Sequence, residues 1–332
     1  MNFKTEITKI HYNKNASGIF FKILQFLSLF YSIGTRFKNF LYDKSVIKPK
    51  KVNAYVISVG NLTTGGVGKT PVVAELVNYL DCKTAIISRG YGGQLPNNNV
   101  NVISDGNNIF YDAKLAGDEP FWLAVNTNAV VITCKNRYKG AKYAIENFGC
   151  SAIILDDGFQ HRKLYRDMDI VLVDSEKMFG NEQLLPAGPL REGLESFKRI
   201  DKFVVVSKNI EHSKAEKFAR VMNKKLSVDS FVCKIEPDKI YNIKTGENLP
   251  ENELITAVCA IGQPEQFFGF LYNYNVKNKL IFDDHHCYKE AELPSGILVT
   301  TEKDAVKMQN FSRNDIYALK LKTQLDAKGV LS

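Results

Sequence analysis

The sequence is poor in cysteine: its 332 residues include six, and no two of them form a C-x-x-C pair. This spacing excludes a zinc ribbon and a disulfide framework, and it favours a reducing compartment. Internal repeats and low-complexity tracts are also missing. Hydrophobic residues make up 45% of the chain and charged residues 24%, which is typical of a globular protein with one large domain or two.

A hydrophobic run long enough to cross a membrane is missing as well. Residues 19–42 are densely apolar and aromatic, but their uncharged part extends only from Ile23 to Thr35, whereas a spanning helix needs about 20 such residues. The stretch also starts too late for a signal peptide, and no small-residue cleavage site follows it. Two interpretations stay open: an interfacial helix whose aromatic residues enter the lipid headgroup layer, and a core helix packed on a sheet.

Acidic residues are fewer than basic ones, 36 against 44, so the formal net charge is +8. The excess favours an anionic partner, such as a nucleotide, a phosphorylated ligand, a nucleic acid or an acidic lipid. The sequence has no basic patch interleaved with aromatic residues and no known nucleic-acid reader motif. We therefore expect no nucleic-acid partner.

A glycine-rich loop between an apolar strand and a helix is the strongest single motif. It follows the run from Tyr55 to Val59 and reads Gly60-Asn61-Leu62-Thr63-Thr64-Gly65-Gly66-Val67-Gly68-Lys69-Thr70-Pro71. Glycines let backbone N–H groups point at phosphate oxygens, and the following helix adds a positive dipole end. Lys69 then reaches the outer phosphates, and the Thr70 hydroxyl binds Mg²⁺. We predict that residues 64–71 bind a nucleoside triphosphate; the alternative is a βα turn that binds nothing.

Thr63 departs from the general phosphate-loop pattern G-x-x-x-x-G-K-[ST], which has glycine at this position. Gly65 and Gly66 shift the flexibility of the loop inward. The strict pattern therefore fails by one residue.

Two carboxylates follow a buried strand further along the chain. Residues 152–155 are apolar and run directly into Asp156 and Asp157. This is the Walker B layout, in which a carboxylate at the strand end meets Mg²⁺ directly or through water. The lesser alternative is a strand-terminal Asp that caps a turn. His161 follows shortly after, and a lone histidine of this kind is more often structural than functional.

Other candidates stand where strands end or helices begin. Arg89 and Tyr91 follow the strand 84–88, at the edge where open α/β sheets bind ligands, and Arg137 follows the strand 129–133. Asp118 and Glu119 precede Pro120. They are either a helix start capped by Asp118, with the proline near the first helical position, or a base or metal group aimed at the phosphates.

A stiff loop with two prolines presents Arg191 and Glu192. An arginine here would neutralise charge on a transferring phosphoryl group. A surface ion pair is the alternative.

Near-continuous Val/Ile runs alternate with helical segments up to about residue 225. This pattern predicts an α/β fold of the phosphate-loop NTPase type, a mostly parallel sheet covered by helices on both faces, with a second, smaller α/β domain. We expect an amphipathic region at 1–50, a nucleotide-binding domain at 51–228 and the smaller domain at 229–325. Residues 230–236 and 316–322 are expected to pair antiparallel as a two-stranded linker.

Within the second half, residues 283–288 read Asp-Asp-His-His-Cys-Tyr. Four contiguous residues cannot all face one tetrahedral zinc ion, and no partner pair exists elsewhere. A histidine at a domain cleft is better suited to acid–base assistance, although a solvent-exposed loop histidine is a substantial alternative.

The motifs occur together in one order, and that order carries a resemblance. They are Gly60-Asn61 with 65–71, Ser88 to Gly92, Gly117 to Pro120, Asp156 to His161, Pro186 to Glu192, Asp284 to His286 and Thr300 to Ala305. From about residue 54 to 305 the chain resembles tetraacyldisaccharide 4′-kinase, the lipid A 4′-kinase of Gram-negative bacteria. Thr63 is typical of that family's version of the loop.

The resemblance implies transfer of the ATP γ-phosphate to the 4′-hydroxyl of a tetraacylated glucosamine disaccharide 1-phosphate, giving lipid IVA. By position, Asp118 and His285 match the base, His285 being preferred over His286 because it follows Asp284. Glu119, Asp156, Asp157 and Glu192 match the carboxylates around Mg²⁺, and Arg191 matches a phosphate-contacting cation. Weaker substrate-binding candidates are Asn61, Arg89, Tyr91, Arg137 and His161.

The resemblance also favours a peripheral position on the cytoplasmic face of the inner membrane, with residues 19–42 on the lipid surface and no obligatory protein partner. A rival reading is a phosphate-loop ATPase recruited to membranes and acting on no lipid acceptor. The two differ in whether ATP consumption requires a phosphorylated acyl-disaccharide.

Overall fold

The computed structural model describes residues 3–208, 212–250, 252–262, 264–283 and 286–332. The described strands form one 12-stranded sheet in the order β10-β9-β11-β12-β8-β7-β6-β1-β5-β2-β4-β3. The strands are β1 Tyr55–Asn61, β2 Thr84–Ser88, β3 Asn101–Asp105, β4 Val130–Thr133, β5 Ala152–Asp156, β6 Met168–Asp174, β7 Lys202–Ser207, β8 Asp229–Asn242, β9 Leu254–Cys259, β10 Asn275–Ile281, β11 Leu298–Thr301 and β12 Ile316–Gln324. The α-helices are α1 Phe3–His11, α2 Ile19–Asp43, α3 Lys69–Tyr79, α4 Ala113–Ala116, α5 Asp118–Asn126, α6 Arg137–Phe148, α7 Ser213–Leu226, α8 Pro264–Phe270, α9 Glu302–Ala305 and α10 Ala327–Leu331.

The larger lobe confirms the predicted mostly parallel sheet. β1 lies between β5 and β6 and pairs in parallel with both, from Tyr55 opposite Ala152 and from Ile57 opposite Met168. β7 and β2 extend the parallel arrangement on either side. Only the edge strand β3, among the described strands of this lobe, runs antiparallel to its neighbour β4.

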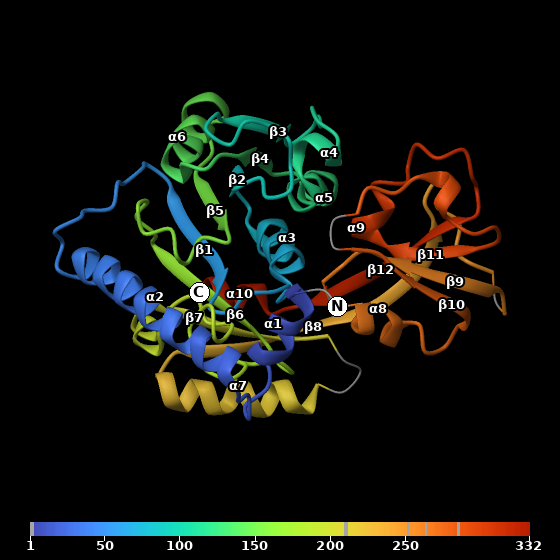
Figure 1. The fold of residues 1–332 in the computed structure, drawn as a ribbon. Helices are drawn as coiled ribbons and strands as arrows, with labels where there is room; N and C mark the ends of the chain where they lie inside the picture. The colour runs from blue at the N-terminus through green and yellow to red at the C-terminus, as the bar shows by residue number, and fades with distance from the viewer. Residues whose placement is uncertain (1–2, 209–211, 251, 263, 284–285) are drawn as a thin grey trace.

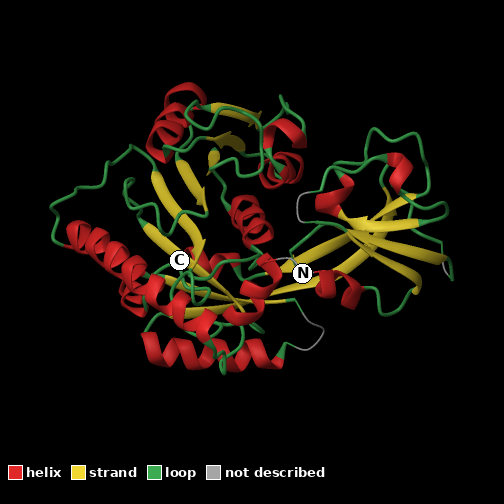
Figure 2. Cartoon of the chain, in the orientation of Figure 1, coloured by secondary structure: helices red, strands yellow, loops and turns green. Residues whose placement is uncertain are grey.

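Helices cover both faces of this sheet because successive side chains of a strand point to opposite faces. On β6, Ile170 and Leu172 pack into the cluster that contains α3 and α10, whereas Val171 and Val173 pack into the cluster that contains α7. Both sets are fully buried. Figure 2 shows the resulting helix–sheet–helix layers. Burial on both faces explains why these strands read as continuous apolar runs.

Two long strands carry the sheet from the larger lobe into the smaller one (Figure 1). β8 and β12 pair antiparallel, from Tyr317 opposite Asn242 to Gln324 opposite Lys234. The strands and their direction agree with the predicted linker, but residues 317–321 lie opposite 237–242 instead of 230–236. The reason is the length of β8, whose 14 residues continue well past the predicted segment.

Helix α2 exposes its large apolar side chains and buries several polar ones, which is the opposite of a core helix. Its buried residues are Leu24, Ser28, Asn39 and Tyr42, two of them polar, and the Ser28 hydroxyl donates to the Leu184 carbonyl at 2.9 Å. Its large apolar side chains point to solvent instead: Phe26, Phe30 and Phe37 are 62%, 59% and 62% exposed. The core-helix interpretation was therefore wrong. None of the helices that the structure describes combines the length and the hydrophobicity of a membrane span.

Candidate active site

The predicted site residues meet at one edge of the sheet. β1, β5, β2 and β4 are neighbours and parallel, so their carboxyl ends lie side by side. The phosphate loop follows β1, Asp156 ends β5, Arg89 follows β2 and Arg137 follows β4 by a few residues. This is the edge at which open α/β sheets bind ligands.

The loop has its left-handed backbone at Gly65 and Gly68, with φ of +105° and +100°. Gly68 is the N-cap of α3, so the helix begins at Lys69 and its free N–H groups point toward the loop. Thr63 is not among the residues with positive φ; it is buried and forms a β-bridge with Leu190. A glycine is therefore not required at position 63, which explains the departure from the general pattern.

Lys69 and Arg191 both contact the Asp157 carboxylate. The Lys69 Nζ lies 3.4 Å from Asp157 Oδ1, and it also donates to the Asn61 side-chain oxygen at 3.2 Å. The Arg191 guanidinium donates to both Asp157 oxygens at 2.9 and 2.8 Å. Burial raises the pKa of Asp157, but the charges of Lys69 and Arg191 outweigh it and hold the pKa at about 2. Asp157 is thus a carboxylate that joins the two cations.

Asp156 has the opposite electrostatics. It is buried, and its Oδ1 atom has no hydrogen-bond partner. Burial and the negative charge of Glu119 raise its pKa to about 7, although Lys69 opposes the shift. Burying a carboxylate oxygen without a hydrogen-bond donor costs free energy, and a bound cation would compensate for that cost.

Asp118 is the first residue of α5, and it does not cap the helix. The N-cap is Gly117, with φ of +93°, and no side chain caps this end. The capping interpretation was therefore wrong, and Pro120 occupies the third helical position. A Cβ atom at Gly117 would lie 2.8 Å from the Tyr91 carbonyl oxygen. Glycine at this position lets the turn after β2 approach the start of α5, which brings the Arg89–Tyr91 turn beside Asp118.

Two lysines of the smaller lobe contact these carboxylates. The Lys307 Nζ lies 3.1 Å from Asp118 Oδ2, with both side chains at least nine-tenths buried. The Lys303 Nζ lies 3.9 Å from Glu119 Oε1 in a more exposed pair. The first turn of α5 therefore lies at the boundary between the lobes.

Glu192 is paired with a cation of the protein itself. It is buried and forms an ion pair with Arg199, whose guanidinium lies 4.3 Å from the centre of the Phe159 ring. The neighbouring Arg191 carbonyl accepts a hydrogen bond from the Tyr31 hydroxyl of α2 at 2.9 Å. The 185–192 loop thus connects the site to the N-terminal helix.

The weaker candidates lie around this centre. Arg137 is buried, and its Nε has no hydrogen-bond partner; burial lowers its pKa, and the charges of Asp156 and Asp157 oppose the change. Burial and the nearby charge of Arg137 lower the pKa of His161 to about 4, so its imidazole is neutral at pH 7. Arg89 and Tyr91 are exposed on their turn.

His285 lies outside the described residues. Its neighbour His286 is engaged by other groups: its Nε2 lies 2.7 Å from Glu292 Oε1, and its ring stacks on Phe282 with 4.6 Å between the ring centres. In the described part of the chain, no three His, Cys, Asp or Glu side chains are grouped to hold a metal ion.

Two residues that were not predicted from the sequence donate hydrogen bonds to backbone carbonyls of the phosphate loop. The Lys208 ammonium donates to the Gly66 carbonyl at 2.6 Å, and the Tyr12 hydroxyl donates to the Thr64 carbonyl at 3.1 Å. Burial lowers the pKa of Lys208 to about 8. Lys208 directly follows β7, so the strand-end rule that identified Arg89 would also have identified it. Tyr12 follows a short helix that carries no such signal.

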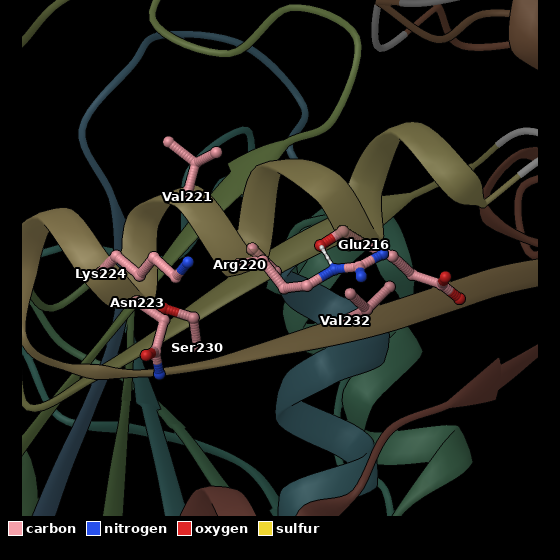
Figure 3. A pocket seen from close by; sticks show the side chains of 8 residues that line it. Glu216, Arg220, Val221, Asn223, Lys224, Ser230 and Val232 are labelled. Atoms are coloured by element: carbon pink, nitrogen blue, oxygen red, sulfur yellow. Dashed lines mark hydrogen bonds between the residues drawn. The ribbon is translucent and has the colours of Figure 1, made fainter.

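A surface groove of about 630 Å³ lies elsewhere, between α7 and β8 (Figure 3). Polar or charged residues and the apolar Ala219, Val221 and Val232 line it together, and the Arg220 Nε donates to the Glu216 carbonyl along the helix. None of the predicted site residues lines it. The groove is therefore separate from the site at the strand ends.

Comparisons with known proteins converge on one family. A family model described as tetraacyldisaccharide-1-P 4′-kinase matches residues 20–332. A tetraacyldisaccharide 4′-kinase from Halothermothrix orenii is 38% identical, with 89% of this chain and 84% of the relative covered, and one from Aquifex aeolicus is 36% identical, with 87% and 90% covered. A crystal structure of Aquifex aeolicus LpxK in complex with ATP superposes with a TM-score of 0.80 at 34% identity, covering 94% of this chain and 97% of that one.

We predict that Asp156 titrates near pH 7 in the nucleotide-free protein. Its pKa is raised from 3.8 to about 7, so between these values the native state holds a proton that the unfolded state has lost. The contribution of this group to the free energy of unfolding therefore falls as the pH rises through that window. Carboxyl ¹³C NMR measures the titration directly.

The variant Asp156→Asn should remove the signal that titrates near pH 7. Asp105→Asn is the matched control, because hydrogen bonds from Asn108 and Asn107 lower the pKa of that exposed carboxyl. An NMR titration in which every aspartate carboxyl has its midpoint below pH 5.5 would contradict the assignment.

Proposed function

The chain belongs to the tetraacyldisaccharide-1-phosphate 4′-kinase family and is an ATP-dependent kinase of lipid A synthesis; we propose that it transfers the γ-phosphate of ATP to the 4′-hydroxyl of a tetraacylated glucosamine disaccharide 1-phosphate. The observation that carries this proposal is the convergence of Lys69, Arg191 and Asp157 beside the phosphate loop. We keep the division at residues 50 and 228 as part of the proposal, with the donor bound by the larger lobe.

Lys69 and Arg191 supply the positive charge for the transferring phosphoryl group. Both now neutralise Asp157, and the oxygens of the γ-phosphate would compete for the same two cations. The loop N–H groups and the N-terminus of α3 would hold the β- and γ-phosphates. Cations that are already fixed in place need little reorganisation during the reaction, which is how positioning lowers the barrier in phosphoryl transfer.

We propose that Asp156, Thr70, Glu119 and Asp157 surround Mg²⁺ when the nucleotide is bound. The unpaired Oδ1 of Asp156 and its raised pKa support this choice. Mg²⁺ commonly binds through one or two carboxylates together with phosphate oxygens and waters, so not every carboxylate of this set has to contact the ion directly. The cation would neutralise charge on the phosphates. We retain Glu192 as a further candidate by resemblance; its carboxylate is paired with Arg199 in this structure.

Asp118 is the proposed base. It stands at the start of α5, beside the turn that carries Arg89 and at the boundary with the smaller lobe, where an acceptor hydroxyl would enter. We retain His285 as its partner by resemblance; the involvement of His286 with Glu292 and Phe282 supports that choice.

Arg137 is a further candidate for contact with the phosphates, because its guanidinium is buried and its Nε has no hydrogen-bond partner.

The exposed face of α2 supports a lipid surface as a partner. Its aromatic side chains point away from the protein, and its inner face is fixed through polar contacts, including Lys38 to the Gln160 carbonyl at 2.9 Å. We propose that this face lies in the headgroup layer on the cytoplasmic side of the inner membrane, as a peripheral anchor. The acyl chains of the acceptor would then stay in the bilayer while its sugar reaches the site.

Replacing the proposed base should separate binding from turnover. Asp118→Asn should bind ATP normally and lose about 10²–10⁴-fold in phosphate transfer, which is the usual contribution of general-base catalysis. Transfer of labelled phosphate from ATP to tetraacyldisaccharide 1-phosphate in mixed micelles measures turnover, and calorimetry measures ATP binding. Near-normal transfer by the folded variant would exclude the base assignment. Hydrolysis of ATP at the same rate with and without the acceptor would favour the ATPase rival.

Removing two outward aromatic side chains should weaken membrane binding. The double variant Phe30→Ser, Phe37→Ser should partition into anionic phospholipid vesicles at least about tenfold less, because each phenyl group buried in lipid contributes on the order of 1–3 kcal/mol. Tyr79→Ser, Tyr272→Ser is the matched control, since these side chains are comparably exposed, 48% and 60%, on other surfaces. An equal loss in both double variants, or no loss in either, would contradict the proposal.

A further inference from the structure

Lys307 holds a buried ion pair across the boundary between the lobes. It follows α9 in the smaller lobe, and its Nζ lies 3.1 Å from Asp118 Oδ2 in the larger lobe. Only 10% of the lysine side chain and 9% of the aspartate side chain are exposed. A pair removed from water to this degree is a strong constraint on geometry, because either charge without its partner would be costly.

The position of Lys307 is itself fixed by the core of the smaller lobe. Its Nζ lies 3.4 Å from Oδ1 of Asp304, a fully buried carboxylate, and 6.0 Å from the centre of the Tyr288 ring. Asp304 Oδ2 accepts hydrogen bonds from the Ala260 N–H at 2.9 Å and from the Thr301 hydroxyl at 3.0 Å. The lysine is therefore held by a carboxylate that is anchored at the ends of β9 and β11.

We propose that Lys307 is a positioning residue for Asp118, which aligns the carboxylate from the opposite lobe. The inference rests on the proposed function of Asp118 as the base. One ammonium group joins two buried carboxylates, one from each lobe, so the orientation of Asp118 depends on the position of the smaller lobe. The base is then correctly aligned only when that lobe is in place against the start of α5.

A second lysine–carboxylate pair, Lys303 with Glu119, lies beside the Lys307–Asp118 pair. Lys303 lies four residues before Lys307 and approaches Glu119, the residue after Asp118, at 3.9 Å. That pair is partly exposed, with 26% and 48% of the two side chains accessible, and such pairs contribute little energy. Lys303 lies within α9 and Lys307 just after it, and of these two lysines only Lys307 forms a buried pair with the larger lobe.

The test is a double-mutant cycle between Lys307→Met and Asp118→Asn, with ATP and tetraacyldisaccharide 1-phosphate as substrates. Lys307→Met keeps the length of the side chain and removes its charge. It should lower kcat by about 10–10²-fold with the KM for ATP within about twofold of wild type, and Lys307→Arg should recover part of the loss. In the Asp118→Asn background the same change should lower kcat no further, because Lys307 acts through Asp118.

Three outcomes would overturn the inference, and they are distinguishable. Normal kcat in Lys307→Met, or additive losses in the double variant, would remove the positioning role and leave the function of Asp118 intact. Normal turnover in Asp118→Asn would remove the proposed base and the inference with it. The control for loss of one charge is Lys322→Met, because Lys322 is an exposed lysine of β12 that pairs with Glu236 of β8. If Lys307→Met does not fold, Lys307→Gln replaces it in the same experiment, because the glutamine amide removes the charge but still has N–H donors for Asp118 and Asp304.

Discussion

The structure depends on one carboxylate, that of Asp157, which two cations from different segments contact together. Lys69 reaches it from the phosphate loop and Arg191 from the 185–192 loop. The Arg191 backbone also accepts from the Tyr31 hydroxyl of α2, and its N–H donates to the Leu62 carbonyl at 2.7 Å. The phosphate loop, the end of β5 and the N-terminal helix are thereby fixed to each other before any nucleotide binds, which is the condition for catalysis by positioning.

Much of this arrangement could be predicted from the sequence, because parallel strands make the carboxyl ends of distant segments neighbours. The apolar runs that end at Val59, Ser88, Thr133 and Asp156 are strands β1, β2, β4 and β5 in the structure. The polar residues that follow these runs form the site. The Gly-Lys-Thr loop and the Asp pair needed no further information, since each carries its chemistry in a contiguous segment.

The remainder could not be predicted, because it depends on contacts between segments without a local pattern. α7 buries Ala215, Ala219 and Met222, but its own pattern does not say that the strands it covers are β7 and β8. The register of β8 with β12 differs from the predicted one because β8 is longer than the sequence pattern indicates. Asp118 reads locally as a helix cap; only the φ of Gly117 and the contact with Lys307 show that it is turned toward the smaller lobe. Burial raises the pKa of both Asp156 and Asp157, and the charges of Lys69 and Arg191 are what lower the pKa of Asp157 below its usual range.

The central claim is that donor and acceptor meet at the strand ends, so that the phosphate is transferred to one sugar hydroxyl. The most direct measurement is a ³¹P–¹H correlation NMR spectrum of the purified product formed from ATP and tetraacyldisaccharide 1-phosphate. The account predicts a new phosphomonoester whose phosphorus correlates with the proton on the 4′ carbon, and its absence when Lys69 is replaced by methionine. Inorganic phosphate as the only new phosphorus species, or a correlation with a different sugar proton, would contradict it.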